Sequence, residues 1–256
     1  CITCSSCKQM IRDGGNAGCP VRDSEIYSPI FQAGRLRDSG YVSELAAACK
    51  DCSPSSCIEG CPADVDIPGF IQAIADREDE KAYNILRQNN NLPEVCAYTC
   101  PVEAQCEKEC VQNFIGEGPV PIQNLQRYVS EVARKKEWTS VSLPETTADK
   151  RIAVIGAGPA GLGCAVELLE KGYNVTIYDS SESPGGMARD VIPEARLKQN
   201  ILKEEVESIL NNVSEDRLKW EFGVTIGEDI SLEEIESNYN AVFLGVGLQE
   251  STSLPI

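Results

Sequence analysis

Histidine is entirely missing from this chain of 256 residues. Its absence excludes Ser-His-Asp and Cys-His catalysis and every metal site that depends on an imidazole ligand. The sequence has no run of about 18 apolar residues, so it predicts no membrane-spanning helix. Basic residues are few, 23 against 40 acidic ones, which gives a net charge of −17. Such a surface repels phosphate backbones and anionic membranes, so we expect neither nucleic acid nor a membrane as a partner.

Cysteine, by contrast, is abundant. The chain has 13 cysteines, and twelve of them lie in the first 110 residues. Most stand in tight groups, whereas the disulfides of a small secreted domain spread through its sequence. Closely spaced thiolates converge on a metal centre, and without histidine the choice is zinc on four thiolates or an iron–sulfur cluster. We therefore expect reduced, ligating thiolates and a cytoplasmic protein.

The cysteine spacing between residues 49 and 110 favours iron–sulfur clusters. The run Cys49-x2-Cys52-x4-Cys57-x3-Cys61-Pro62 is close to the bacterial ferredoxin run, which ends in Cys-Pro and whose fourth cysteine serves a second cluster. Zinc ribbons use two Cys-x-x-Cys pairs, and this segment has one. The ligands that remain come from a second group, which consists of Cys96, Cys100, Cys106 and Cys110. The pattern predicts two [4Fe-4S] clusters.

A further cysteine group stands at the start of the sequence. It is Cys1-x2-Cys4-x2-Cys7-x11-Cys19. Three close thiolates and a fourth beyond a glycine-rich loop can complete a site of their own, which predicts a third [4Fe-4S] cluster. A zinc site and an unloaded remnant are the alternatives. Since the chain starts with a cysteine, we expect it to be a piece of a longer polypeptide.

At Arg151 the pattern changes to a nucleotide-binding βαβ unit. A buried strand, a glycine-rich turn, a helix and a second strand follow one another, and Asp179 ends the second strand. Glycines permit the tight turn and the approach of a diphosphate to the helix N-terminus, and the acid is placed to bind ribose hydroxyls. The turn is Gly156-Ala157-Gly158-Pro159-Ala160-Gly161. We predict a dinucleotide site here.

Three features favour FAD over NAD at this site. Gly185 and Gly186 follow the second strand, and Arg196 comes soon after, placed to contact phosphate or flavin. An ordinary surface position is the alternative for Arg196. The third feature is the clusters themselves, because a flavin converts a hydride into the single electrons that iron–sulfur centres accept.

The predicted fold is an α-helical iron–sulfur domain followed by a partial α/β Rossmann-like FAD-binding domain. Helical periodicity predicts a helix capped by Asp66 and another from about Ile122 to Lys136. We expect a cysteine-rich segment over residues 1–20 and a connector over 21–48. A helical domain with two clusters should span 49–138, followed by a linker over 139–149 and the FAD domain over 150–256.

These motifs together resemble the small subunit of bacterial glutamate synthase and, more closely, the N-terminal half of dihydropyrimidine dehydrogenase. The likeness covers roughly residues 45–256 and includes Ile192-Pro193-x-x-Arg196 and the run 243–248. It implies a helical domain with two [4Fe-4S] clusters beside an FAD domain that is interrupted by an NADPH domain. That NADPH domain is not in this chain.

The resemblance also implies ligands. One cluster would be held by Cys49, Cys52, Cys57 and Cys110. The other would be held by Cys61, Cys100, Cys106 and Gln126. Chemistry alone favours Cys96 over Gln126 as the eighth ligand, and the choice stays open. For FAD, the likeness carries over Gly156 to Ala160, Asp179 to Met187, and Arg196, with Ile226 as a weaker transfer.

Residues 1–19 are similar to the cluster segment that follows the FMN-binding barrel in trimethylamine dehydrogenase and dienoyl-CoA reductases. We interpret the chain as an electron-transfer module of an NAD(P)H-dependent oxidoreductase. It would serve a catalytic subunit or fused domain, such as an FMN barrel, within a hetero- or homo-oligomer, and would contain no acid–base residue. One alternative is a non-catalytic, zinc-stabilised interaction domain with a nucleotide-binding sensor. The other is a dehydrogenase whose clusters are only structural.

Overall fold

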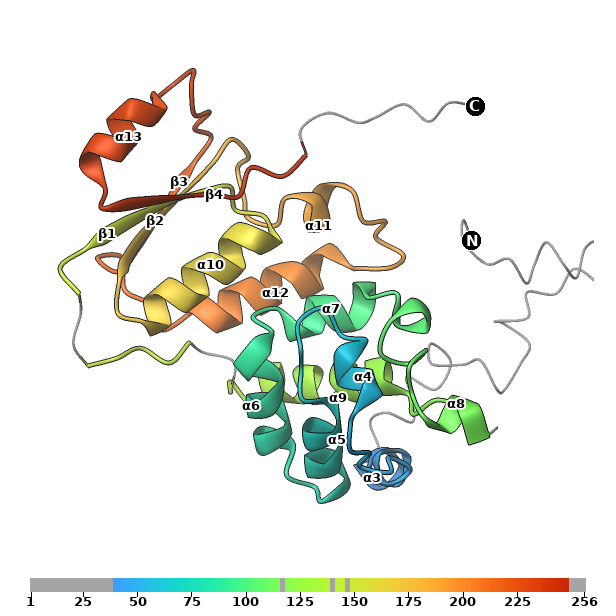
Figure 1. The fold of residues 1–256 in the computed structure, drawn as a ribbon. Helices are drawn as coiled ribbons and strands as arrows, with labels where there is room; N and C mark the ends of the chain where they lie inside the picture. Colours follow the sequence, from blue (N-terminus) through green and yellow to red (C-terminus); the bar gives the residue numbers. More distant parts are fainter. Residues whose placement is uncertain (1–38, 116–117, 139–140, 146–147, 249–256) are drawn as a thin grey trace, which may run out of the picture.

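The computed structural model describes residues 39–115, 118–138, 141–145 and 148–248, and it divides into a helical part and an α/β part (Figure 1). The cysteines at positions 1, 4, 7 and 19 lie outside the described residues. The helical part contains α3 Ser39–Ala47, α4 Ser56–Glu59, α5 Ile67–Ala75, α6 Asp79–Asn89, α7 Pro93–Thr99, the 3-10 helix η3 Val102–Ala104, α8 Gln112–Ile115 and α9 Ile122–Lys135.

Helix α5 is the centre of the helical part. Asp66 caps it as predicted, because its side chain accepts a hydrogen bond from the Gly69 amide at 3.0 Å, and Pro68 occupies the first turn. The side chains of Phe70 and Ile74 are buried against the neighbouring helices. Helices α3, α6 and α9 pack around it. This core supports the cysteine-bearing loops.

Helix α3 lies in the stretch for which the sequence predicts a connector. Its Val42 and Ala46 are buried, and the Ser43 hydroxyl donates a hydrogen bond to the Ala75 carbonyl at the end of α5. In the structure this helix therefore packs as part of the helical core.

The α/β part is built on a parallel sheet in the order β3-β2-β1-β4. Its strands are β1 Arg151–Ile155, β2 Asn174–Asp179, β3 Leu218–Phe222 and β4 Ala241–Leu244. Helices α10 Pro159–Glu170 and α12 Gln199–Leu210 cover one face, and α13 Leu232–Asn238 covers the other (Figure 1). Strand order reverses between β1 and β4, where parallel sheets bind ligands at the carboxyl ends of their strands.

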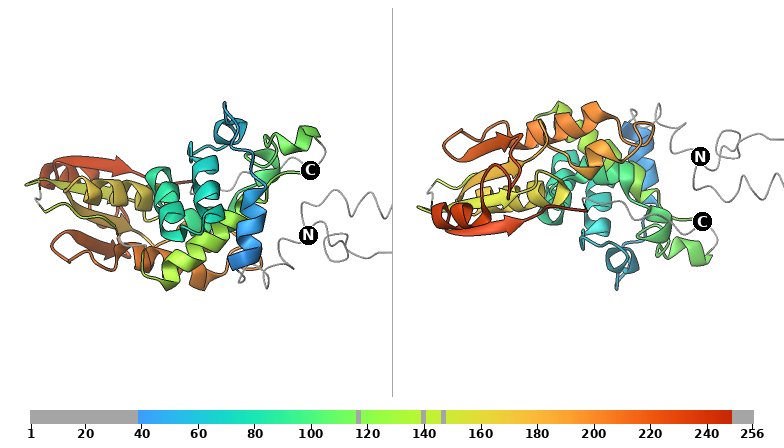
Figure 2. Two further views of the ribbon diagram at one scale, coloured as in Figure 1. Left: turned by 90° about the horizontal axis from the view of Figure 1, so that it is seen from below. Right: turned by 90° about the horizontal axis from the view of Figure 1, so that it is seen from above.

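The predicted fold class is confirmed: a helical domain precedes a parallel-sheet, Rossmann-like domain. Figure 2 shows the sheet and its helices at one end of the molecule and the cysteine-bearing helices at the other. Within the described ranges, no helix is both long and apolar enough to pass through a bilayer.

Candidate iron–sulfur and dinucleotide sites

Four cysteines from distant parts of the sequence line one cavity in the helical domain. Cys49 and Cys52 come from the loop after α3, Cys57 from α4, and Cys110 from the turn before α8. The rest of the wall is largely apolar and includes Ile67, Pro68, Ile71, Val111, Val120 and Ile122. These are the four cysteines that the resemblance assigns to one cluster, and the structure brings them together.

The environment of this cavity suits thiolates that are neutralised by a metal. Burial, followed by the charges of Cys49 and Cys110, raises the pKa of the Cys57 thiol to about 11. Burial likewise raises the pKa of Cys49. Thiols in such an apolar, crowded place ionise only when a cation compensates their charge, as iron does in a cluster. The donor set therefore fits an iron–sulfur centre.

Three further cysteines form a second group. Burial, followed by the charges of Glu107 and Cys61, raises the pKa of Cys106 to about 12. The hydrogen bond from Cys96 is the largest influence on Cys100 and lowers its pKa. The charges of Cys106 and Cys61 act in the opposite direction and raise it. The structure thus gathers the three cysteines that the resemblance assigns to a second cluster.

The two candidates for the eighth ligand lie on neighbouring helices. Cys96 stands on α7, one turn before Cys100, and hydrogen-bonds to it. Gln126 stands on α9, and its amide nitrogen donates a hydrogen bond to the Pro93 carbonyl at 2.8 Å. The choice between them stays a prediction.

Among the described side chains, no three acidic or cysteine groups converge tightly enough to share a single metal ion. A cubane needs a wider arrangement, because each thiolate binds a different iron atom, whereas four thiolates around zinc share one centre.

Two glycine-rich loops meet at the carboxyl edge of the sheet. Gly156 has φ +105°, and a Cβ built on it would lie 2.3 Å from the Gly245 carbonyl oxygen. A Cβ on Gly186, which has φ +48°, would lie 2.9 Å from the Cα of Gly158. Only glycine fits such a close approach of backbones. Helix α10 begins directly after the first of these loops, and a helix N-terminus in this position can bind a diphosphate through its free N–H groups.

Asp179 stands at the end of β2, where the sequence predicts a ribose contact. Its carboxylate accepts hydrogen bonds from the amides of Ala157, at 2.6 Å, and Ser181, at 2.8 Å. The Gly185 amide donates to the Ala157 carbonyl at 2.8 Å. The residues predicted to surround a dinucleotide are therefore joined to one another through Ala157.

The other predicted FAD contacts are placed differently. Met187 begins the short helix α11 Met187–Asp190 and is half exposed. Ile226 lies in the loop after β3 and bridges to Ile230. Arg196 points toward the helical domain, where its guanidinium donates to the Thr99 carbonyl at 2.7 Å, beside Cys100. Arg196 thus links the α/β domain to the residue that precedes Cys100.

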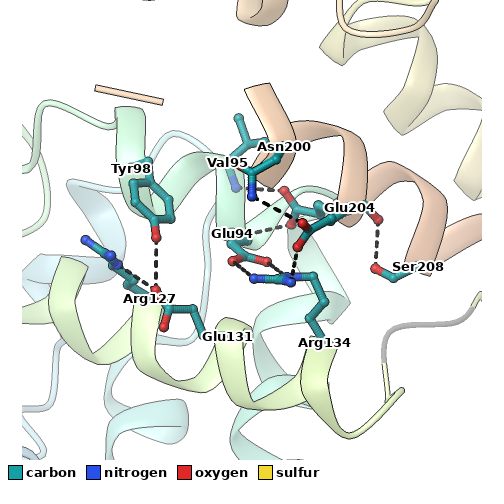
Figure 3. Close-up of polar contacts among 10 residues, drawn as sticks. Glu94, Val95, Tyr98, Arg127, Glu131, Arg134, Asn200, Glu204 and Ser208 are labelled. Carbon is teal, nitrogen blue, oxygen red and sulfur yellow. Dashed lines mark hydrogen bonds and ion pairs between the residues drawn. The ribbon is translucent and has the colours of Figure 1, made fainter. Parts of the chain in front are cut away.

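Sequence reasoning missed a buried polar group between the two domains. Glu205 of α12 and Glu94 of α7 are each 2% exposed. Glu94 pairs with Arg134 of α9 at 2.9 Å, and Arg134 also contacts Glu204 (Figure 3). The sequence does carry one signal for it, because Glu205 stands at helical spacing in the apolar stripe of α12 with Leu202, Val206 and Ile209.

Comparison with known families separates the same two parts. Residues 34–138 match the model of dihydropyrimidine dehydrogenase domain II, a 4Fe-4S cluster domain. The helical part is similar to this iron–sulfur family. Residues 154–202 match an NAD(P)-binding Rossmann-like domain. The 4Fe-4S domain begins before α3, which agrees with the packing of that helix.

Curated relatives align with most of this chain, across both of its parts. The Escherichia coli K12 protein described as NAD-dependent dihydropyrimidine dehydrogenase subunit PreT is 35% identical over 217 residues, covering 82% of this chain and 50% of the relative. The glutamate synthase [NADPH] small chain of Halomonas elongata is 32% identical over 228 residues, covering 88% and 45%. The predicted resemblance is confirmed, and the chain spans about half the length of these relatives.

Among solved structures, Mycobacterium tuberculosis FprA in complex with NADPH is similar with a TM-score of 0.38 and 23% identity, over 43% of this chain and 25% of that one. A likeness of this size carries no argument about function.

Proposed function

We propose that this chain is an electron-transfer module of an NAD(P)H-linked oxidoreductase that passes electrons between FAD and [4Fe-4S] clusters. The proposal rests on one observation: an apolar cavity lined by Cys49, Cys52, Cys57 and Cys110 occurs in the same chain as a glycine-rich dinucleotide loop. Relatives described as subunits of dihydropyrimidine dehydrogenase and of glutamate synthase support this assignment.

The cysteines would hold two clusters in the helical domain. The cavity group would bind one, and Cys61, Cys100 and Cys106 would bind the other with Gln126 or Cys96. The apolar wall excludes water from the first group, which protects a cluster and tunes its potential. When bound, FAD exchanges electron pairs with a nicotinamide and single electrons with iron–sulfur centres.

The α/β domain would bind and orient the flavin nucleotide. The N-terminus of α10 offers backbone N–H groups and a partial positive charge to the diphosphate. Asp179 would accept hydrogen bonds from the ribose. Arg196, which contacts Thr99, would keep the flavin end of the site next to the cluster end.

The further parts of the electron path lie beyond the described residues. The cysteines 1, 4, 7 and 19 would hold a third cluster, and an NAD(P)H-binding domain would complete the FAD domain. Electrons would leave toward a catalytic subunit or fused domain, such as an FMN barrel, in the cytoplasm.

The test is the cofactor content of the protein purified without oxygen. We expect a brown protein with about 12 iron atoms and matching acid-labile sulfide per chain, together with one FAD. In the full-length protein, NAD(P)H should reduce both flavin and clusters. A colourless protein that carries zinc and no flavin would instead support the zinc-stabilised sensor and overturn the proposal.

A further inference from the structure

Helix α7 is held at its N-terminus by a side chain from the other domain. The two carboxyl oxygens of Glu205, on α12, accept hydrogen bonds from the backbone amides of Glu94, at 2.6 Å, and Val95, at 2.7 Å (Figure 3). Both amides belong to the first turn of α7, and the Glu205 side chain is buried.

These two amides are the ones that the helix cannot satisfy by itself. Pro93 has no N–H, the Cys96 amide already donates to the Leu92 carbonyl, and the cap residue Leu92 has no side-chain acceptor. Glu205 therefore completes the helix start from across the domain boundary. Without it, two buried donors would lack partners, which is a costly arrangement.

The opposite end of α7 is held from the same domain. Thr99, its last residue, accepts the hydrogen bond from Arg196, and Cys100 follows directly. Along its length, α7 is fixed to α9, because the Tyr98 hydroxyl donates to Glu131 at 2.9 Å and Glu94 pairs with Arg134 (Figure 3). The helix that leads into a cluster ligand is thus bound at both ends by the dinucleotide domain.

We propose that Glu205 is a positioning residue, which fixes α7 and with it Cys100 relative to the dinucleotide loops. The inference rests on the proposed function for its consequence, the transfer of electrons between flavin and cluster. Its physical basis is independent of the cofactors, since both hydrogen bonds join protein groups.

The first test is hydrogen exchange of the Glu94 and Val95 amides in the wild-type chain. First-turn amides of a helix ordinarily exchange quickly, because they have no intrahelical acceptor. We expect these two to be protected. The measurement is made at pH 9, because burial raises the pKa of Glu205 to about 8 and the carboxylate is the form with two full acceptors. Fast exchange in the wild type would overturn the proposal without any variant.

The second test is the variant Glu205→Gln, whose amide nitrogen faces a backbone N–H and cannot accept from it. We expect the α7 amides to exchange about tenfold faster or more. Glu207→Gln is the matched control, because Glu207 lies on the same helix with its side chain 64% exposed. Equal α7 exchange in Glu205→Gln and wild type would overturn the positioning role.

The third test follows electrons in the full-length protein loaded with its cofactors. By stopped-flow absorbance, Glu205→Gln should reduce its flavin at the wild-type rate, keep its iron and FAD, and pass electrons to the clusters severalfold more slowly. Equal transfer rates in variant and wild type would refute the consequence for electron transfer. A wild type whose clusters are never reduced would refute the proposed function instead, while the exchange result would stand by itself.

Discussion

At the scale of single residues, the cysteine spacing carried most of the functional information. The motif around Cys49 to Cys61 pointed to clusters, and the structure places Cys110, far away in sequence, at the same cavity. Glu205 could not be found in this way. It lies beside Glu204 and near Glu207 in a run of acids, and its helical spacing from Leu202 and Ile209 is what places it on the buried face of α12.

A cysteine-to-serine change tests the ligand assignment. Cys57→Ser removes one thiolate from the cavity, so the protein should lose about four iron atoms per chain. Cys164→Ser is the control, because that thiol lies on α10 in the α/β domain and should keep its iron. Iron and sulfide analysis after anaerobic purification measures both. Full iron content in Cys57→Ser would remove Cys57 from the ligand set.

At the scale of elements, the long amphipathic helices were the most predictable. The periodicity that predicts a helix from about Ile122 to Lys136 marks α9, which spans Ile122–Lys135, and Asp66 caps α5 as expected. Helix α7 has seven residues, and Pro93 at its first position is a start signal in the sequence. Its cap residue Leu92 has no side-chain acceptor, so the acceptors for its first turn come from Glu205 of the other domain.

The meeting of the two glycine loops gives a prediction about flavin binding. Gly186→Ala places a Cβ 2.9 Å from the Cα of Gly158 in a strained backbone, so the loops must separate. FAD content should fall strongly while iron content stays at the wild-type level. Gly163→Ala, where the nearest atom to a new Cβ is 4.0 Å away, should keep its FAD. Unchanged flavin content in Gly186→Ala would argue against a diphosphate site at these loops.

At the scale of the whole molecule, the two domains share a buried, charged boundary. Charged pairs cross it at its margins as well: Arg87 contacts Glu170, and Asn91 donates to Glu167 and to the Gly163 carbonyl. Composition and motifs predicted two domains with different cofactors. They could not predict the boundary, because it depends on how two surfaces meet.

The buried Glu205 predicts how stability changes with pH. Burial first, opposed by the hydrogen bond from the Glu94 amide, raises its pKa to about 8. The unfolded chain releases this proton near pH 4.5, so between pH 6 and 8 the folded state binds the extra proton. This contribution to the unfolding free energy should therefore fall as pH rises, by up to about 1.4 kcal/mol per pH unit.

Urea unfolding of wild type and Glu205→Gln at pH 6, 7 and 8 measures this slope as a difference between the two proteins. The charged and titratable groups around Glu205 remain in both, so their effects largely cancel. These groups are Glu94, Glu204, Arg134, Cys96 and Tyr83. Parallel stability curves for the two proteins would show that Glu205 does not titrate in this range.

The first turn of α7 is capped by Glu205, a residue of the other domain, and this has a consequence for recombination between flavoproteins. A chimera that joins this cysteine-bearing half to an unrelated nucleotide-binding half, with the crossover in the segment 139–149, would inherit a helix start with two unmatched donors. A successful exchange would have to carry an acidic residue at the equivalent point of the incoming helix. The two halves are therefore expected to have been inherited as one unit, because a carboxyl group of one half completes a helix of the other.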